Sequence, residues 1–188
     1  PVKPSSTLSH AANFLYMLQG NEPSTDAANL MDKDFVLHAD HGSNASAFTA
    51  RTVAGTAADV HGAVTAGIAA LSGPSHGGAA ENVMQMAKEI GKPENAADYV
   101  HDLLSSRQRV MGFGHRVYKA EDPRARHLRE GVKNLSEEMG QPEWYQILEG
   151  VVDAMKPYAR RGIHVNVDFF AGVIYYLNGF PQDLFVPI

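Results

Sequence analysis

The chain has 188 residues, of which 44% are hydrophobic and 20% are charged, and these are ordinary values for a globular protein of one or two domains. Its net charge of −5 argues against a nucleic-acid-binding protein that neutralises phosphates, and the absence of cysteine excludes disulfides and thiolate chemistry. The longest apolar run, 62–71, is too short to cross a membrane, and no signal peptide is visible. We therefore expect a cytoplasmic protein that has neither a membrane nor a nucleic acid as partner.

Helical signals dominate the sequence. Apolar residues recur at helical spacing, and many of these segments begin near a proline or a capping residue and end at a glycine. Asp26 is expected to cap the second helix, which contains Leu37. The other helices are expected at about 5–19, 44–54, 58–71, 78–90, 96–106, 123–139, 143–158 and 168–177.

One passage differs from this pattern. Ile163, Val165 and Val167 alternate with polar residues, which is typical of a β-strand. No partner strand is visible elsewhere, and an isolated strand is not stable. We expect an extended connection here and an all-α fold. Charged residues are sparse between 35 and 80 and dense between 88 and 161, which predicts a buried layer of small-residue helices followed by a more exposed helical subdomain.

Two histidines lie three residues apart near the end of the second predicted helix, at His38 and His41. On one helix face this spacing could bind a metal ion. No third ligand is obvious, however, and Gly42 would end the helix at once. We expect contact with an anion and no metal site, and the main alternative is that these histidines cap the helix or lie in the core.

A third histidine, His76, lies between Gly73-Pro74-Ser75 and Gly77-Gly78, directly before a predicted helix. The positive end of the helix dipole favours a neutral imidazole at this place. A neutral imidazole can donate a hydrogen bond to a developing oxyanion. The alternative is a turn in which His76 only caps the helix.

The segment 111–124 contains glycines on either side of Phe113, which let backbone amides approach a ligand closely. His115 follows directly, and cations lie one and four residues further on. A histidine beside fixed cations suits an anionic substrate that contains a carbonyl group. The alternative is a surface turn that happens to contain a histidine.

Asp168 is flanked by Val167, Phe169 and Phe170. A carboxylate in such surroundings is poorly hydrated, so its pKa rises and it becomes a better base. The alternative is an aspartate that caps the following helix, and both roles can hold at once.

Together these stretches resemble the citrate synthase family in order and spacing, over essentially all 188 residues. The stretches that carry the resemblance are 38–46, 73–78, 112–124 and 166–168. The resemblance implies an all-helical fold, a homodimer and a role in the tricarboxylic acid cycle. It also implies a large-domain segment at 1–76, a small domain at 77–167 and a return to the large domain at 168–188.

The family's catalytic roles carry over to the matching positions as expectations. His76 would stabilise the enol of acetyl-CoA, and Asp168 would abstract its methyl proton. His115 would polarise the carbonyl of oxaloacetate, while His41 and Arg124 would bind its carboxylates. The expected reaction forms citryl-CoA and hydrolyses it to citrate and CoA. The alternatives are a 2-methylcitrate synthase that uses propionyl-CoA and a non-catalytic interaction module of the same fold.

The resemblance also implies a binding segment for CoA, with no cofactor other than the co-substrate acetyl-CoA. The expected CoA-binding residues are Val110, Met111, Gly112, Phe113, Gly114 and Lys119, the last near a phosphate. Ala80 stands where the family usually has asparagine, and Ala171 stands where it often has serine. The sequence stops before two arginines that bind oxaloacetate in the family, one of them donated across the dimer. We therefore expect a fragment that lacks the N-terminal half and the extreme C-terminus and is inactive alone.

Overall fold

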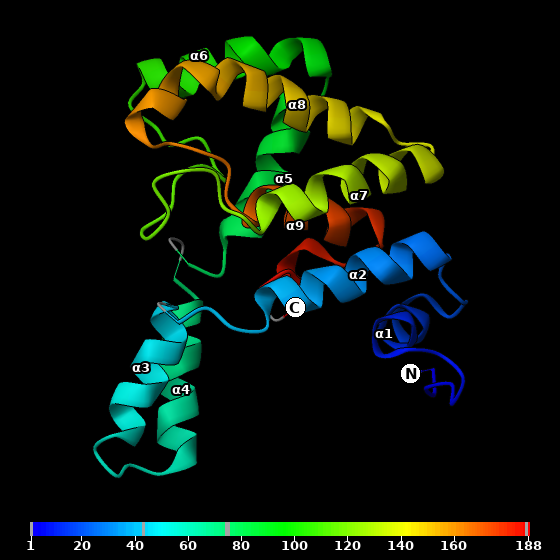
Figure 1. Cartoon of the computed structure of the whole chain (residues 1–188), viewed down its shortest axis with the longest axis vertical. Coiled ribbons are helices and arrows are strands. Elements are labelled where there is room, and N and C mark those ends of the chain that lie inside the picture. Colours follow the sequence, from blue (N-terminus) through cyan, green and yellow to red (C-terminus); the bar gives the residue numbers. More distant parts are fainter. Residues whose placement is uncertain (1, 43, 74–75, 187) are drawn as a thin grey trace.

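The computed structural model describes residues 2–42, 44–73, 76–186 and 188 (Figure 1). Within these ranges the chain is helical and has no β-strand beyond an isolated antiparallel bridge between Phe113 and Val165. The predicted all-α fold is confirmed. The α-helices are α1 (His10–Gln19), α2 (Thr25–His38), α3 (Ala45–Ala54), α4 (Val60–Leu71), α5 (Ala79–Ile90), α6 (Ala96–Ser105), α7 (Ala125–Glu138), α8 (Glu143–Met155) and α9 (Asp168–Leu177). Short 3-10 helices are η1 (Pro93–Asn95), η2 (Lys156–Arg161) and η3 (Gln182–Leu184).

Polar caps set several of the helix ends. Ser9 and Ser24 each accept a backbone N–H of the first turn, so α1 begins later than predicted and Ser24 takes the capping place predicted for Asp26. Gly20 ends α1 in the left-handed region, as its place in the sequence predicts. The helix predicted at 143–158 changes into η2 after Met155, because Pro157 has no N–H to continue the α-helical ladder.

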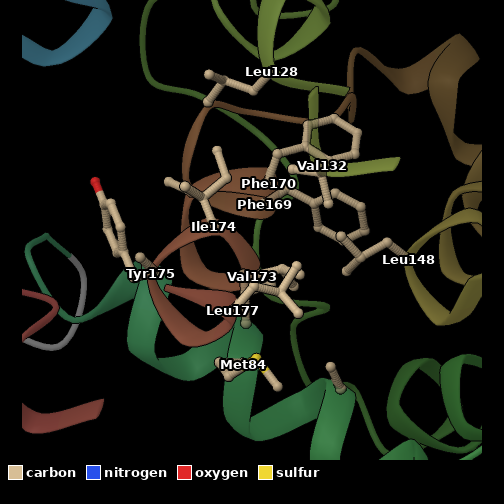
Figure 2. Packing of buried hydrophobic residues seen from close by; sticks show 14 of the residues in the cluster. Met84, Leu128, Val132, Leu148, Phe169, Phe170, Val173, Ile174, Tyr175 and Leu177 are labelled. Carbon is tan, nitrogen blue, oxygen red and sulfur yellow. The ribbon is translucent and has the colours of Figure 1, made fainter. Parts of the chain in front are cut away.

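The core is built around α9, which packs against α5 and α7 and also contacts α8. Figure 2 shows Phe169 and Phe170 of α9 gathered with residues of α7 and α8, among them Val132 and Leu148. On another side of the helix, Gly172 lies directly against the Ala80 carbonyl of α5, where a side chain would not fit. Because α9 is anchored on several sides, its first residue, Asp168, is held in a defined place.

The hairpin formed by α3 and α4 projects from the rest of the molecule (Figure 1). Its two helices pack chiefly against each other, and Ala63 is the one buried residue among those described in them. Phe48 is 68% exposed and Ile68 is 60% exposed. The prediction of a buried small-residue layer is therefore wrong for this chain. A low density of charged residues indicates that a helix surface suits contact with protein. It does not indicate whether that contact is made within the same chain or with another molecule.

The segment before α9 is extended, as predicted, but the expectation that it lacks a partner is wrong. It pairs with the glycine-rich loop: the Gly114 N–H donates to the His164 carbonyl over 2.7 Å, and the Asn166 N–H donates to the Gly112 carbonyl over 2.9 Å. This pairing brings the loop that contains His115 next to the start of α9. The domain boundaries at 76/77 and 167/168 stay a prediction.

Candidate active site

One cavity of about 580 Å³ lies between the end of α2, the start of α5, the loop 114–124 and the start of α9. Residues far apart in the sequence meet there. Five of the candidate side chains line it: His41, His76, His115, Arg124 and Asp168. The cavity is therefore the natural place to examine the chemistry of these groups.

The orientation of His115 is set by its own loop. Its Nδ1 accepts the backbone N–H groups of Val117 and Tyr118, each over 3.1 Å. Because Nδ1 is occupied as an acceptor, the neutral ring carries its proton on Nε2. Partial burial lowers the pKa of His115, as do the positive charges of Arg124 and Lys119, against the opposing influence of Asp122. His115 is thus a neutral donor that offers Nε2–H to a ligand.

Arg124 is held beside that ring by a buried carboxylate that the sequence reading did not single out. Asp122 accepts the Arg124 backbone N–H and Nε–H, both over 3.0 Å, and the Nη2–H over 2.8 Å. It also accepts the Val167 N–H over 3.2 Å. Burial alone would raise the pKa of Asp122, but the hydrogen bonds from Arg124 outweigh burial and lower it. Asp122 therefore stays ionised, and its bidentate pair fixes the guanidinium 3.5 Å from His115 Nε2.

The neighbouring rings complete a cationic and aromatic corner. The His41 and His115 ring centroids are 5.3 Å apart, and the Tyr118 ring lies 4.6 Å from that of His115. Tyr118 also lies 5.9 Å from the Arg124 guanidinium carbon. His38 ends α2, whereas His41 lies beyond it, so the two do not share a helical face. Among the described residues no group of three or more metal-ligating side chains gathers.

His76 also lines the cavity and is supported by the first turn of α3. The Ser46 N–H donates to His76 Nε2 over 3.3 Å. The Ser46 hydroxyl lies 3.0 Å from the same nitrogen and 2.7 Å from Asn44 Oδ1, to which it donates. A backbone N–H can only donate, so this contact favours a proton on Nδ1, whereas the Ser46 hydroxyl, which gives its own proton to Asn44, can accept only from a proton on Nε2. The two contacts orient the His76 ring and favour opposite tautomers. His76 does not cap α5, whose cap position is Gly78 without a side-chain cap hydrogen bond.

Asp168 is partly exposed because it lines the cavity, but protein surrounds it on its other sides. Burial raises its pKa, with His38 and Arg124 as the main opposing influences, so the direction predicted from its apolar neighbours is confirmed. The alternative of a helix cap is wrong, because Val167 occupies the cap position of α9 and no side-chain cap hydrogen bond forms there.

Asn166 joins the two halves of the site. Its Nδ2–H donates to the Gly114 carbonyl over 3.0 Å, and its Oδ1 accepts the Asp168 N–H over 3.1 Å. One side chain thus links the residue before His115 to the candidate base. Asn166 lies two residues before Asp168 in the sequence. An asparagine at the junction of a loop and a helix is the signal by which this supporting role could have been predicted.

The predicted CoA-binding segment follows the rim of this site. Gly114 lines the large cavity, and Phe113 lines a separate one of about 150 Å³. Gly112 has φ +75°, and a side chain there would run into the Phe169 ring. Val110 is buried, Met111 is half-buried and Lys119 is exposed, and none of these three lines either cavity. Gly112 thus allows close packing against Phe169 and the Gly114 N–H pairs with His164, and the approach of these backbone amides to a ligand stays a prediction.

The site combines two imidazoles, a fixed guanidinium and a carboxylate that protein surrounds on all sides but the cavity. The carboxylate can take a proton, the imidazoles can stabilise oxygen atoms that gain negative charge, and the guanidinium can bind an anionic group. Groups of these kinds, placed together in one cavity, can perform acid–base chemistry beside a bound anion.

Comparison with known proteins narrows the class of protein. The sequence matches the family described as citrate synthase, C-terminal domain, over residues 1–188. It is 45% identical to citrate synthase 2 of Bacillus subtilis over 100% of this chain and 50% of that protein. It is 42% identical to 2-methylcitrate synthase 2 of Corynebacterium glutamicum, with the same two coverages.

Solved structures agree with these matches. The crystal structure of citrate synthase from Pyrobaculum aerophilum gives a TM-score of 0.89 at 41% identity, over 99% of this chain and 47% of that one. Citrate synthase of Thermoplasma acidophilum, solved as a ternary complex with carboxymethyl coenzyme A and oxaloacetate, gives 0.88 at 32% identity, over 99% and 50%. A citryl-CoA lyase from Hydrogenobacter thermophilus gives 0.77 at 29% identity, over 97% and 70%.

The chain belongs to the citrate synthase family. It spans about half the length of the curated relatives it matches.

Proposed function

We propose that the whole protein condenses acetyl-CoA with oxaloacetate and hydrolyses the resulting citryl-CoA to citrate and CoA. The observation that carries this proposal is that the Asp168 carboxylate and the imidazoles of His76 and His115 line one cavity, where backbone N–H groups orient both rings. The methyl protons of a thioester are very weakly acidic, so a base alone is not sufficient. A donor to the enol oxygen must act at the same time.

In the first step Asp168 takes a methyl proton of acetyl-CoA while His76 Nδ1–H donates to the thioester oxygen, which gains negative charge as the enol forms. The enol carbon then attacks the ketone carbon of oxaloacetate and a carbon–carbon bond forms. His115 Nε2–H polarises that ketone and stabilises the negative charge on its oxygen. In the last step water adds to the thioester of citryl-CoA and the CoA thiol leaves.

Recognition of oxaloacetate is assigned to Arg124 and His41. The carboxylate groups of oxaloacetate suit the guanidinium that Asp122 holds in place, because a fixed guanidinium binds a planar carboxylate without further ordering. CoA is assigned to the segment 110–114, on the rim of the cavity, with Lys119 near a phosphate. The complex of the Thermoplasma acidophilum enzyme with oxaloacetate and carboxymethyl coenzyme A supports these two ligands.

The exposed hairpin supports a homodimer as part of the same proposal. Phe48, Val60, Val64 and Ile68 leave large apolar groups on α3 and α4, where a second copy would bury them. The described part of the chain contains no helix long and apolar enough to cross a membrane. A cytoplasmic location and a place in the tricarboxylic acid cycle complete the proposal.

The second candidate is a 2-methylcitrate synthase, which the 42% identity to the Corynebacterium glutamicum enzyme favours. Propionyl-CoA would use the same base and donors, and one additional methylene in an apolar pocket changes transition-state binding by only about 1–3 kcal/mol. The two candidates therefore differ in pocket shape rather than in chemistry.

A substrate comparison in the whole protein tests both candidates. Release of the CoA thiol is measured with oxaloacetate and either acetyl-CoA or propionyl-CoA, and the products are identified by mass spectrometry. We expect citrate and a higher kcat/KM for acetyl-CoA. A higher kcat/KM for propionyl-CoA would support the second candidate, and cleavage of citryl-CoA to acetyl-CoA and oxaloacetate without net synthesis would contradict both.

A further inference from the structure

Asp34 is a buried carboxylate that takes no part in the mechanism above. It lies on α2 and is 1% exposed. The Tyr175 hydroxyl of α9 donates to its Oδ2 over 2.8 Å. Figure 2 shows the Tyr175 side chain on the other side of the α9 ribbon from Phe169 and Phe170, and its ring belongs to the apolar cluster. A carboxylate that is removed from water needs partners of this kind, and the second partner is a histidine of the cavity.

That histidine is His38, one turn further along α2. Its Nδ1 lies 3.0 Å from the Asp34 backbone oxygen and 3.3 Å from Asp34 Oδ1. The backbone oxygen can only accept, so Nδ1 carries a proton and donates to it. Asp34 Oδ1 lies at ion-pair distance from Nδ1 without a hydrogen bond. Because Nδ1 is bound in this way, the imidazole is oriented by Asp34 in either charge state.

His38 lines the same cavity as Asp168. The charged groups that act on His38 are Asp34 from its own helix and Asp168 from α9. Those that act on Asp168 are His38 from α2, Arg124 and Asp122 from the loop before α7, and His76 from the loop before α5. His38 is thus the link between the buried pair and the candidate base.

Asp34 influences the pKa of His38, and His38 in turn influences the pKa of Asp168. Burial lowers the pKa of His38, but Asp34 outweighs burial and the pKa is raised overall. Burial and the adjacent Asp34 raise the pKa of Tyr175, so its hydroxyl remains a donor. For Asp168, His38 is the largest of the influences that oppose the raising effect of burial.

We propose that Asp34 and Tyr175 are positioning residues: Asp34 orients His38 with Nδ1 protonated and stabilises its positive charge, Tyr175 holds the Asp34 carboxylate and moderates its effect, and together they control how readily Asp168 accepts a proton. This inference rests on the proposed function, because it gives Asp168 the role of the base. It assigns a task to a buried pair that the condensation chemistry alone does not require.

Asp34→Asn tests this inference directly. Asparagine keeps the size of the side chain and an oxygen that can accept the Tyr175 hydroxyl, but it removes the negative charge. The His38 ring nitrogens and the Asp168 carboxyl carbon are titrated by NMR in the whole protein without substrates. We expect the pKa of His38 to fall and that of Asp168 to rise. Asp32→Asn, an exposed residue on the same helix, should move neither.

Tyr175→Phe is the second variant. It distinguishes an effect of the Asp34 charge from a general destabilisation of the fold. It removes the donor to Asp34 but keeps the carboxylate, which then attracts the His38 proton more strongly, so the pKa of His38 should rise. Opposite shifts in the two variants support the proposal. It is overturned if Asp34→Asn leaves the His38 titration unchanged or if both variants shift it in the same direction.

The activity measurement is kept separate from these titrations. In Asp34→Asn the acidic limb of kcat should move to higher pH, while KM for oxaloacetate stays unchanged, because His38 acts on the base rather than on the carboxylates. A limb that does not move while His38 responds as expected would overturn the link to Asp168. A wild-type protein that makes no citrate would overturn the proposed function, and the titrations would still decide the electrostatic link.

Discussion

Asp122→Asn is expected to destabilise the folded chain strongly, because Asp122 is the acceptor for four hydrogen bonds from Arg124 and Val167. Its side chain is 0% exposed and that of Arg124 is 16% exposed. Asparagine has one oxygen in place of two, and its NH2 group would face donors that already point at it. Two of the four bonds are therefore lost, and the guanidinium loses its counter-charge in a buried place.

The size of the effect follows from these losses. A hydrogen bond to a charged partner contributes about 1.5–3 kcal/mol, and breaking one partner of a buried ion pair costs about 3–5 kcal/mol. We expect the free energy of unfolding to fall by about 3–5 kcal/mol, a large share of the ~5–15 kcal/mol of a typical domain. Urea denaturation at pH 7, followed by far-UV circular dichroism, measures this change. Glu121→Gln, at the exposed neighbouring position, is the control.

The pH dependence gives a sharper test of the same reasoning. The pKa of Asp122 is lower in the folded chain than its ordinary value of 3.8. Its contribution to stability is therefore complete above that ordinary value and is lost as the pH falls through the lower, folded value. The difference between wild type and Asp122→Asn should stay constant from neutral pH down to about pH 5 and shrink below about pH 4. A loss no larger than that of the control, or a loss that persists unchanged in acid, would refute the argument.

Three further predictions concern the site and the chain as a unit. Asp168→Asn should leave folding almost unchanged and slow condensation by about two to four orders of magnitude, and an unchanged rate of solvent exchange at the methyl group of acetyl-CoA would show that Asp168 is not the base. Gly112→Ala should lower the melting temperature in calorimetry and weaken CoA binding, because φ +75° and the adjacent Phe169 ring leave no room for a side chain; Gly140→Ala, with φ +67° but open space, should lose only the cost of the backbone strain. The 188-residue chain by itself should show little thiol release, because the arginines that the family resemblance places outside it are each worth about 1.5–3 kcal/mol as carboxylate partners, and turnover equal to that of the whole protein would contradict this.

The sequence marked His76, His115 and Asp168, because each lies in a short motif with its own glycine or helix junction. These motifs left a structural alternative open for each residue, and the roles, together with His41 and Arg124, came from the family resemblance. The raised pKa of Asp168 could also be predicted, because its apolar neighbours are adjacent in the sequence. Signals of this kind depend only on adjacent residues, so they can be identified without the tertiary structure.

The supporting residues could not be predicted, since their partners are distant in the sequence. Asp34 looks like one more polar residue on a helix until Tyr175 of α9 comes to lie against it. Asp122 looks like the first residue of a proline turn until Val167 donates to it. The exposure of the α3–α4 hairpin could not be predicted either. A low density of charge indicates that a surface suits contact with protein, but it does not indicate which molecule makes that contact.

The main-chain pairing between 112–114 and 164–166 has a consequence for how this sequence can vary. The spacing between His115 and Asp168 is maintained by these backbone hydrogen bonds, by the Asn166 side chain and by the buried faces of α7 and α8 that pack against α9, and not by the outer faces of these helices. Solvent-facing positions of α7 and α8 can therefore drift in evolution, or be redesigned in the laboratory, without altering the reaction geometry. This part of the fold is a suitable place to introduce labels, surface charges or crystal contacts.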